Sequence, residues 1–560
     1  MNKKKWFSGI ILLYYIVFWN INAQQLKKTT LPVSVVKDTL TSIKDIKNIP
    51  QWYYKDIIAD SLPGISLDKA YQKLSMTGGD TVIVAVIDMP VYIAHPALKE
   101  QIWVNTKEIP NNGIDDDQNG YIDDLHGWNF LGKKDGSGMQ FVQQEYARIL
   151  FRDNLIFSEG EKNGDSAQRQ EYLKAKEKHS NRMAEAVEIR KNATVLYKDY
   201  FKAKRSIEHY FGEVVMEVDR IDSLKQRYSD NDSLQYQLLL WNDCIKNSLS
   251  EEWVVSYKKK ADQRIAVLLN IERDVKKEVD SFPENKNYIN YGHHNIAAHA
   301  SEMKHGTLVA GMLGVSRNSA IDNFKGISDR ILVMPICVSA NGDPHDKDIA
   351  LAIRYAVDQG AKVINMSFGK AFSLHPEWVD EALEYAEKKG VLVVTSAGNT
   401  ATNLNENTNR YYPNDYGTKE KEEVVDNVIM VGASSYLINS KLAASFSSYG
   451  NRYVDIFAPG DQIRTTVPEA SYRKDRGTSL SSALVSGIAA LLYQYYPTLE
   501  VGEIKEIILK SGVRYTFPVA VPGAEKNEKM PFSSLSKSGS IANAYRALLM
   551  AEKKVASKAE

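Results

Sequence analysis

Three residue types that can together cleave an acyl bond occur in separate short segments of this sequence. Asp88 ends an apolar run, His305 opens the segment His-Gly-Thr-Leu-Val-Ala-Gly, and Ser479 closes the tripeptide Gly-Thr-Ser. A serine hydroxyl is a weak nucleophile unless an imidazole takes its proton, and a carboxylate must hold that imidazole in the right tautomer. Each residue alone has an ordinary explanation, as a turn cap, a packed histidine or a helix start. Together, in the order Asp, His, Ser, they predict nucleophilic catalysis.

The segments around these residues alternate between two hydrophobic patterns. Continuous apolar runs predict buried strands at residues 81–88, 331–337, 361–368, 390–396 and 428–432. Amphipathic stretches at 348–359 and 378–389 predict helices between them. The alternation indicates an α/β fold in which helices cover both faces of a mostly parallel central sheet. Functional groups gather at the carboxyl ends of such strands, where Asp88, Asn399 and the segment Ser367-Phe368-Gly369 lie.

The segment between Asp88 and His305 has a different amino-acid composition. Residues 165–282 contain no proline and a single glycine, with a dense mixture of charged residues and leucine. Apolar residues from Val254 to Val279 recur at spacings of three and four, which predicts one long amphipathic helix. We interpret residues 135–285 as an all-helical insertion, a hairpin or small bundle, in a surface loop. Its charged face is either plain solvated surface or a binding site for a protein partner.

The first residues have the pattern of an export signal. Three lysines from Lys3 precede an apolar run over residues 6–19, and a small residue, Ala23, ends the segment. This pattern predicts a signal peptide over residues 1–23 and an exported protein, periplasmic or extracellular, that contacts the membrane only before cleavage. An uncleaved anchor is the alternative, but the apolar run is short of the roughly 20 residues that span a bilayer.

Composition excludes several classes of protein. The chain has 560 residues, 43% of them apolar, and its 70 basic and 70 acidic side chains give a formal net charge of zero. A neutral chain offers no electrostatic argument for a nucleic-acid partner. With only Cys244 and Cys337, both interpreted as free thiols, a disulfide-stapled scaffold and a cysteine-based zinc site are excluded.

Four short segments resemble the subtilase family, the subtilisin-like serine proteases. They are Val-Ile-Asp88, His305-Gly-Thr, Ser-Ala-Gly-Asn399 and Gly-Thr-Ser479. The resemblance covers residues 51–551 apart from the helical insertion and implies one peptidase domain. It leaves a short N-terminal segment over 24–50, too short to form a folded propeptide domain, and a charged tail over 552–560.

The resemblance also implies a role for each matching residue. Asp88 would orient His305, which would serve as general base and then general acid, while Ser479 would form the acyl-enzyme. Asn399 would donate its side-chain amide to the oxyanion. An extended polypeptide substrate would pair along Ser367, Phe368 and Gly369.

Several positions depart from the family pattern. Leu308, Leu480 and Ala483 replace a histidine, a methionine and a proline, and none of these changes removes a catalytic group. Met89-Pro90 stands where the family has a small hydroxyl residue and glycine, and proline removes an N–H that could support the acid. This pair and the long insertion favour a rival hypothesis, a weak or inactive subtilase scaffold that binds a partner through its insertion. An esterase that uses the same triad is a third.

Oxygen-bearing side chains at alternate positions followed by glycine match the first half of a calcium loop. The candidate ligands are Asp115, Asp117, Asn119, Tyr121 and Asp124. Oxygen ligands favour Ca²⁺ over zinc, so we expect a structural calcium ion. An acidic turn without an ion is the alternative, because His126 replaces the glutamate that closes an EF-hand loop. Ala97 stands where many family members have a calcium-binding aspartate.

Overall fold

The computed structural model describes residues 49–74, 76–157, 166–297, 302–319, 321–406, 408–416, 423–524 and 528–559. The predicted signal peptide and nearly all of the predicted segment 24–50 lie outside these residues. Within the described residues, no helix combines the length and the apolar character needed to cross a membrane.

An eight-stranded sheet forms the centre of the domain, with the strand order β2-β1-β3-β4-β5-β6-β12-β9. Neighbouring strands pair in parallel except β12 and β9, which are antiparallel. The strands are β1 (Val82–Asp88), β2 (Ile331–Cys337), β3 (Val363–Met366), β4 (Leu392–Ser396), β5 (Val428–Ser434), β6 (Ile456–Pro459), β9 (Val513–Arg514) and β12 (Ser540–Ile541). Two separate hairpins pair β7 (Ile463–Val467) with β8 (Ser471–Asp475) and β10 (Pro518–Ala520) with β11 (Lys529–Pro531).

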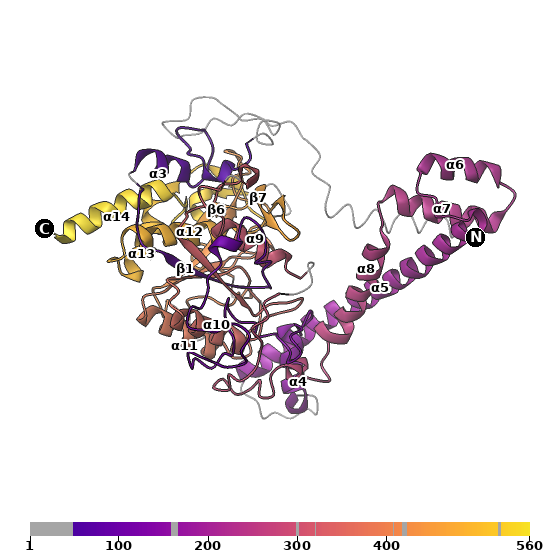
Figure 1. The fold of residues 1–560 in the computed structure, drawn as a ribbon, viewed down its shortest axis with the longest axis horizontal. Helices are drawn as coiled ribbons and strands as arrows, with labels where there is room; N and C mark the ends of the chain where they lie inside the picture. The colour runs from indigo at the N-terminus through magenta and orange to yellow at the C-terminus, as the bar shows by residue number, and fades with distance from the viewer. Residues whose placement is uncertain are drawn as a thin grey trace. The chain divides into compact units, whose positions relative to one another are not determined.

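Helices cover both faces of this sheet, which confirms the predicted α/β fold (Figure 1). Val84 and Val86 of β1 pack in one buried cluster with α9 (Lys304–Leu313) and α12 (Thr478–Tyr495), whereas Ala85 and Ile87 pack in a second cluster with α10 (Asp346–Asp358) and α11 (Pro376–Lys388). Because β1 is buried on both faces, its apolar run is unbroken rather than alternating. The remaining helices of the domain are α3 (Leu67–Lys73), α13 (Val501–Ser511) and α14 (Ala544–Ala559).

The predicted strands correspond to β1 to β5, with ends that differ by a few residues. Outside the predicted set are the short strands β6, β9 and β12 and the two hairpins. Helix α14 continues to Ala559, so the segment 552–560 that is predicted as a charged tail is helical as far as that residue.

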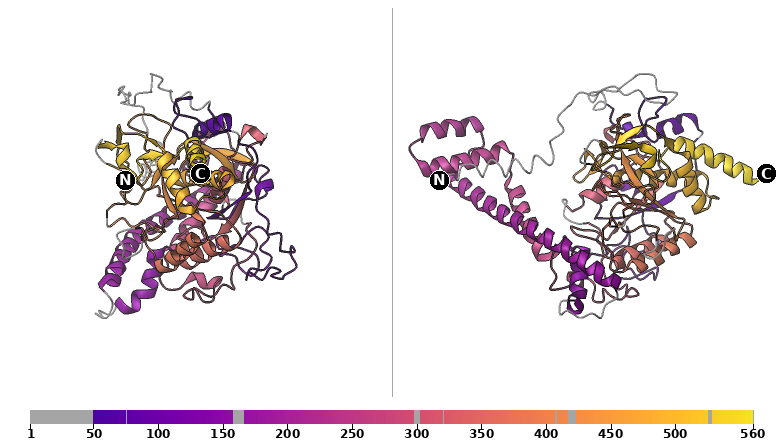
Figure 2. Two further views of the ribbon diagram at one scale, coloured as in Figure 1. Left: turned by 90° about the vertical axis from the view of Figure 1, so that its left-hand side faces the viewer. Right: turned by 180° about the vertical axis from the view of Figure 1, so that it is seen from behind.

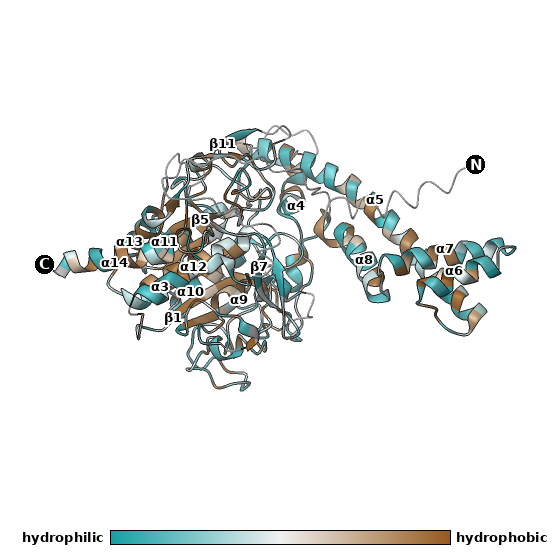
Figure 3. Cartoon of the chain, turned by 90° about the horizontal axis from the view of Figure 1, so that it is seen from above, coloured by the Kyte–Doolittle hydropathy of each residue, from teal (hydrophilic) through white to brown (hydrophobic). Residues whose placement is uncertain are grey.

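The insertion is helical over most of its length. Its helices are α4 (Glu145–Phe157), α5 (Ser166–Phe211), α6 (Val218–Arg227), α7 (Asp232–Lys246) and α8 (Glu251–Gln263). Helices α7 and α8 both pack on α5, and Figure 2 shows α8 beside α5 from behind. Most of α5 is hydrophilic (Figure 3), consistent with a helix that buries only one narrow stripe.

The prediction of one long helix from Val254 to Val279 is wrong. Helix α8 ends at Gln263, a π-helical turn follows over Arg264–Leu268, and the next helical residues are the 3₁₀ turn Val275–Glu278. Tertiary hydrogen bonds replace the helical ones in between. The Gln143 side chain donates to the carbonyls of Asn270 and Arg273 at 2.7 and 2.9 Å, so the chain turns where the apolar spacing alone predicts a continuous helix.

Candidate active site

The fold brings Asp88, His305 and Ser479 into one line. They lie at the carboxyl end of β1 and in the first turns of α9 and α12, respectively. His305 Nδ1 is 2.6 Å from Asp88 Oδ1, and His305 Nε2 is 3.1 Å from Ser479 Oγ. Both distances are those of hydrogen bonds, so a proton can pass from the hydroxyl to an imidazole that the carboxylate orients.

Close backbone packing places the histidine beside the acid. A Cβ atom at Gly306 would lie 2.2 Å from the carbonyl oxygen of Met89 and 2.6 Å from that of Pro90. Only glycine allows α9 to begin this near the segment that follows Asp88. The hydroxyl of Thr307 also accepts a hydrogen bond from the backbone N–H of Tyr92 at 2.9 Å. The residues directly after His305 are therefore held against the segment that follows Asp88.

Burial increases from the imidazole to the acid. The His305 side chain is 36% exposed, Ser479 is 7% exposed and Asp88 is 1% exposed. Burial acts to lower the pKa of His305, but the adjacent Asp88 carboxylate outweighs it, so that the pKa of His305 lies above its ordinary value. The site therefore stabilises the imidazolium that forms when His305 takes a proton.

The Met89-Pro90 departure leaves one carboxylate oxygen without support. Asp88 Oδ1 accepts a hydrogen bond from the backbone N–H of Met89 at 2.6 Å and also lies against His305. Asp88 Oδ2 is buried and has no hydrogen-bond partner within the described part of the chain. Pro90 has no N–H with which to fill that role. The carboxylate is nevertheless held in line with the imidazole.

Two hydrogen-bond donors border the space beside Ser479. Asn399 Oδ1 accepts from the backbone N–H and the hydroxyl of Thr478 at 2.9 and 3.1 Å, which turns Asn399 Nδ2 away from Thr478. A Cβ atom at Gly477 would lie 3.5 Å from Asn399 Nδ2 and 3.7 Å from the backbone nitrogen of Ser479. The two nitrogens therefore share an open space, as the stabilisation of an oxyanion requires.

The predicted substrate-binding segment adjoins the nucleophile. The Ser479 hydroxyl lies 3.1 Å from the carbonyl oxygen of Ser367, and the Ser367 hydroxyl donates to the carbonyl of Ser479 at 3.0 Å. Phe368 packs partly against the second sheet cluster. The chain's own Tyr412 already pairs with Lys370 through backbone hydrogen bonds of 2.9 and 2.8 Å. The pairing of Lys370 with Tyr412 therefore lies directly after the predicted substrate-binding residues Ser367, Phe368 and Gly369.

A cleft of about 330 Å³ opens beside the imidazole and the hydroxyl. The side chains that border it include Met89, Leu308, Asp475 and Arg476. Two of these, Met89 and Leu308, are positions where the sequence departs from the family pattern, so the departures shape the walls of the cleft.

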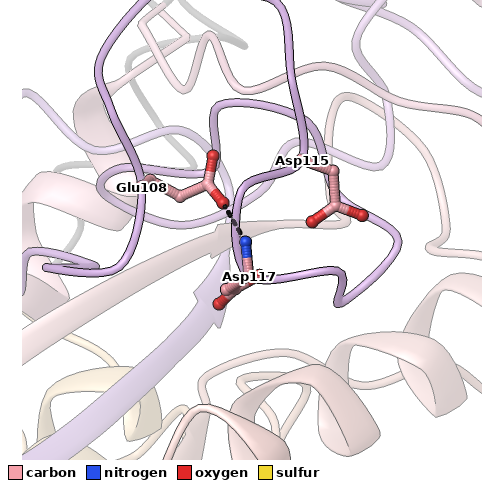
Figure 4. A group of neighbouring side chains, drawn as sticks. All are labelled: Glu108, Asp115 and Asp117. Atoms are coloured by element: carbon pink, nitrogen blue, oxygen red, sulfur yellow. Dashed lines mark hydrogen bonds between the residues drawn. The ribbon is translucent and has the colours of Figure 1, made fainter.

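The acidic loop brings together only part of its predicted ligand set. Carboxylate oxygens of Asp115, Asp117 and Glu108 lie within 4.8 Å of one another (Figure 4). Asn119 and Asp124 instead hydrogen bond to each other at 3.0 Å. The side chain of Tyr121 packs among buried aromatic rings.

Glu108 is absent from the predicted set because it precedes the repeating motif. Its carboxylate accepts hydrogen bonds from the backbone N–H groups of Asp116, Asp117 and Asp123, at 3.0, 3.2 and 3.1 Å. An acidic residue shortly before the loop is the only sequence signal for it.

Comparison with known proteins identifies the family. A family model described as the subtilase family matches residues 79–525, a span that contains Asp88, His305, Asn399 and Ser479. The chain belongs to the subtilase family. The helices and strands outside that span include α3, β11, β12 and the C-terminal helix α14.

Curated subtilases align with parts of the chain. It is 37% identical over 189 residues to the thermophilic serine proteinase of Bacillus sp. (strain AK1), across 34% of this chain and 42% of that protein. It is 33% identical over 202 residues to subtilisin DY of Bacillus licheniformis, across 36% of this chain and 67% of that protein. It is 30% identical over 239 residues to the cell wall-associated protease of Bacillus subtilis (strain 168), across 42% of this chain and 24% of that protein.

Proposed function

We propose that this subtilase is a serine endopeptidase that cleaves polypeptides through an acyl-enzyme. The observation that carries the proposal is the unbroken line of hydrogen-bond distances from Asp88 through His305 to Ser479, 2.6 and 3.1 Å. Membership of the subtilase family supports it independently.

We assign a step of the reaction to each group. Ser479 Oγ attacks the substrate carbonyl carbon while its proton moves to His305 Nε2, and Asp88 stabilises the resulting cation. Asn399 Nδ2 and the backbone N–H of Ser479 donate to the oxygen that becomes negative. His305 then gives the proton to the departing amine. Water repeats the sequence on the acyl-enzyme, and Ser479 regains its proton.

Labelling with a fluorophosphonate probe tests this assignment. We expect covalent modification of Ser479 that is abolished by Ser479→Ala and kept by Ser481→Ala, because the Ser481 hydroxyl bonds to the carbonyls of Ala458 and Pro459 instead. We expect Asn399→Ala to keep the label but to slow peptide hydrolysis by about 100- to 1,000-fold. A folded protein that takes no label supports the rival scaffold, in which the insertion is a binding module. Turnover of esters without peptides supports an esterase.

We also propose that the enzyme acts outside the cytoplasm, in the periplasm or beyond. The sequence pattern of residues 1–23 supports export, and one relative is named as a cell wall-associated protease. N-terminal sequencing of the mature protein tests this, with Gln24 expected as the first residue. A mature protein that keeps the apolar run at its N-terminus contradicts it.

The acidic loop is proposed to hold a structural Ca²⁺ ion. Asp115, Asp117 and Glu108 supply oxygen ligands without nitrogen or sulfur, which suits a hard cation. Such an ion would stabilise the loop and would take no part in the acyl-transfer chemistry.

Thermal unfolding with and without calcium tests this second proposal. Calcium at about 100 times its dissociation constant should add about 2.7 kcal/mol to the free energy of unfolding. Asp117→Asn should abolish the gain, while Asp135→Asn, in an exposed turn, should keep it. Unfolding that is indifferent to calcium and EDTA would show that the loop is an ordinary acidic turn.

A further inference from the structure

Two glycines flank the place where a substrate residue must sit. Gly369 and Gly398 follow β3 and β4, which are parallel neighbours with Met366 opposite Thr395. The first of these segments touches the nucleophile, because Ser479 Oγ lies 3.1 Å from the Ser367 carbonyl oxygen. The second leads directly into Asn399. The gap between the two segments therefore opens at the nucleophile.

The direction of attack places one substrate side chain in that gap. The attacked carbonyl carbon must lie at Ser479 Oγ, with its oxygen toward Asn399 Nδ2. A substrate strand that pairs along Ser367–Gly369 then carries its preceding Cα between the two glycine segments. Because both flanking residues are glycines, they have no side chains in the gap. The space left for a substrate side chain therefore depends on which other side chains of the protein extend into the gap.

The ring of Tyr411 enters it. A Cβ atom at Gly369 would lie 2.2 Å from ring carbons of Tyr411 and 2.5 Å from its hydroxyl oxygen. A Cβ atom at Gly398 would lie 3.0 Å from the same ring. Carbon atoms in ordinary contact are about 3.5–4.0 Å apart. The ring therefore spans the gap from one glycine to the other.

Tyr411 is held there by its neighbours. The adjacent residue Tyr412 exchanges two backbone hydrogen bonds with Lys370, and Asn414 Nδ2 donates to the Tyr411 carbonyl at 2.7 Å. The Lys370 ammonium group is itself fully buried, 2.7 Å from Asp346 and 3.0 Å from Glu145. The segment that carries the ring is thus fastened to the domain directly after Tyr411.

The space around the nucleophile is therefore uneven. The cleft of about 330 Å³ is bordered by Met89, Leu308 and Leu480, and its border includes neither Gly369 nor Gly398. A large side chain therefore has room in this cleft, on one side of Ser479. On the other side, the Tyr411 ring occupies the space between Gly369 and Gly398.

We propose that Tyr411 fills the pocket for the residue before the scissile bond and restricts cleavage to sites where that residue is glycine or alanine. This inference rests on the proposed peptidase function and adds its selectivity. Tyr411 acts as a specificity residue that contacts the substrate and takes no part in proton transfer.

A series of peptides that differ only in the residue before the scissile bond tests the proposal. The quantity to measure is kcat/KM for glycine, alanine, leucine and phenylalanine at that position. The wild type should favour glycine and alanine. In Tyr411→Gly the ratio of phenylalanine to alanine should rise by about 100-fold, because an opened apolar pocket admits the larger side chain. Tyr411→Phe, which keeps the ring, should keep the wild-type order.

Titration of Ser479 with a fluorophosphonate separates the possible failures. If wild-type protein takes no label and cleaves no peptide, the peptidase function fails and this selectivity fails with it. If the wild type is labelled but prefers leucine or phenylalanine, the selectivity alone is overturned, whether or not any variant folds. An equal change of kcat/KM for all peptides in labelled Tyr411→Gly also overturns it, since Tyr411 would then be structural.

Discussion

Two parts of the helical insertion, a base (α4 and residues 264–285) and an arm (residues 200–251), both carry many charges, but they place those charges in opposite environments. At the base, Lys276 lies 2.6 Å from Asp348 of α10 with both side chains 0% exposed, and Lys347 of α10 lies 2.6 Å from Asp280. In the arm, Arg220 and Glu213 pair with 49% and 57% of their side chains exposed. A buried ion pair offsets the cost of removing two charges from water only if its geometry is close to ideal, whereas water screens the attraction between exposed charges. Buried ion pairs therefore join the base to α10, whereas this ion pair of the arm lies at the surface.

The base also contacts the residues next to the proposed substrate-binding edge. Glu145 at the start of α4 lies 3.0 Å from the Lys370 ammonium group and accepts a hydrogen bond of 2.7 Å from the backbone N–H of Leu374. Lys370 directly follows Gly369. Part of the insertion thus contacts the segment on which a substrate is proposed to pair.

The largest expected effect comes from removing one buried charge at the base. Lys276→Met leaves Asp348 buried without its ammonium partner, which should lower the free energy of unfolding by about 3–5 kcal/mol. Lys204→Met is the matched control in the arm, because Lys204 pairs with Glu251 at the surface and should cost less than about 1 kcal/mol. Urea unfolding of both variants measures the difference. Equal losses would show that base and arm are not distinct.

A smaller effect is expected on catalysis. Glu145→Gln weakens the hold on Lys370, and we expect kcat/KM for extended peptides to fall about 10-fold because a small displacement of the pairing edge is costly. Labelling by a small fluorophosphonate, which does not use that edge, should keep its rate. Glu278→Gln, at a half-exposed pair of the base with Lys133, is the control and should change neither quantity. An unaltered kcat/KM in Glu145→Gln would show that the insertion does not contribute to substrate binding.

The smallest effect on hydrolysis is expected from the arm itself. Trp241 is 1% exposed, packs on Tyr200 and donates to the Val215 carbonyl at 2.6 Å. Trp241→Ala should weaken packing by about 3–5 kcal/mol within α5 to α7 and speed hydrogen exchange there. Cleavage of short peptides should be unchanged. Trp128→Ala, in the cluster on the sheet, is the comparison and should impair hydrolysis. Loss of hydrolysis in Trp241→Ala would mean that the arm supports catalysis.

The parts of the fold that could be predicted from the sequence are those that depend on the residues of one short segment. Strands β1 to β5 are buried on both faces and therefore appear as continuous apolar runs. Asp88, His305 and Ser479 stand in short segments whose residue types carry the chemistry. Strand β6 is not among the predicted strands because its short run ends in Pro459, and a proline argues against a strand.

The remaining features depend on contacts between distant segments. Lys276 belongs to a charged stripe that indicates a solvated face, yet it is fully buried because Asp348 and the Phe130 carbonyl receive its ammonium group. Tyr411 follows an irregular loop and carries no motif of its own. Its position between Gly369 and Gly398 results from tertiary folding, which a pattern along the chain does not encode.

The pH dependence of Ser479 modification tests the central claim most directly. His305 must be neutral to accept the proton, and Asp88 raises the pKa of His305, so the rate should increase with pH through a midpoint above about 6.5. Asp88→Asn removes the carboxylate that raises this pKa. Its midpoint should move to lower pH, and its rate should fall by about 10,000-fold. A rate that does not change across this range of pH, or that Asp88→Asn leaves intact, would contradict the account.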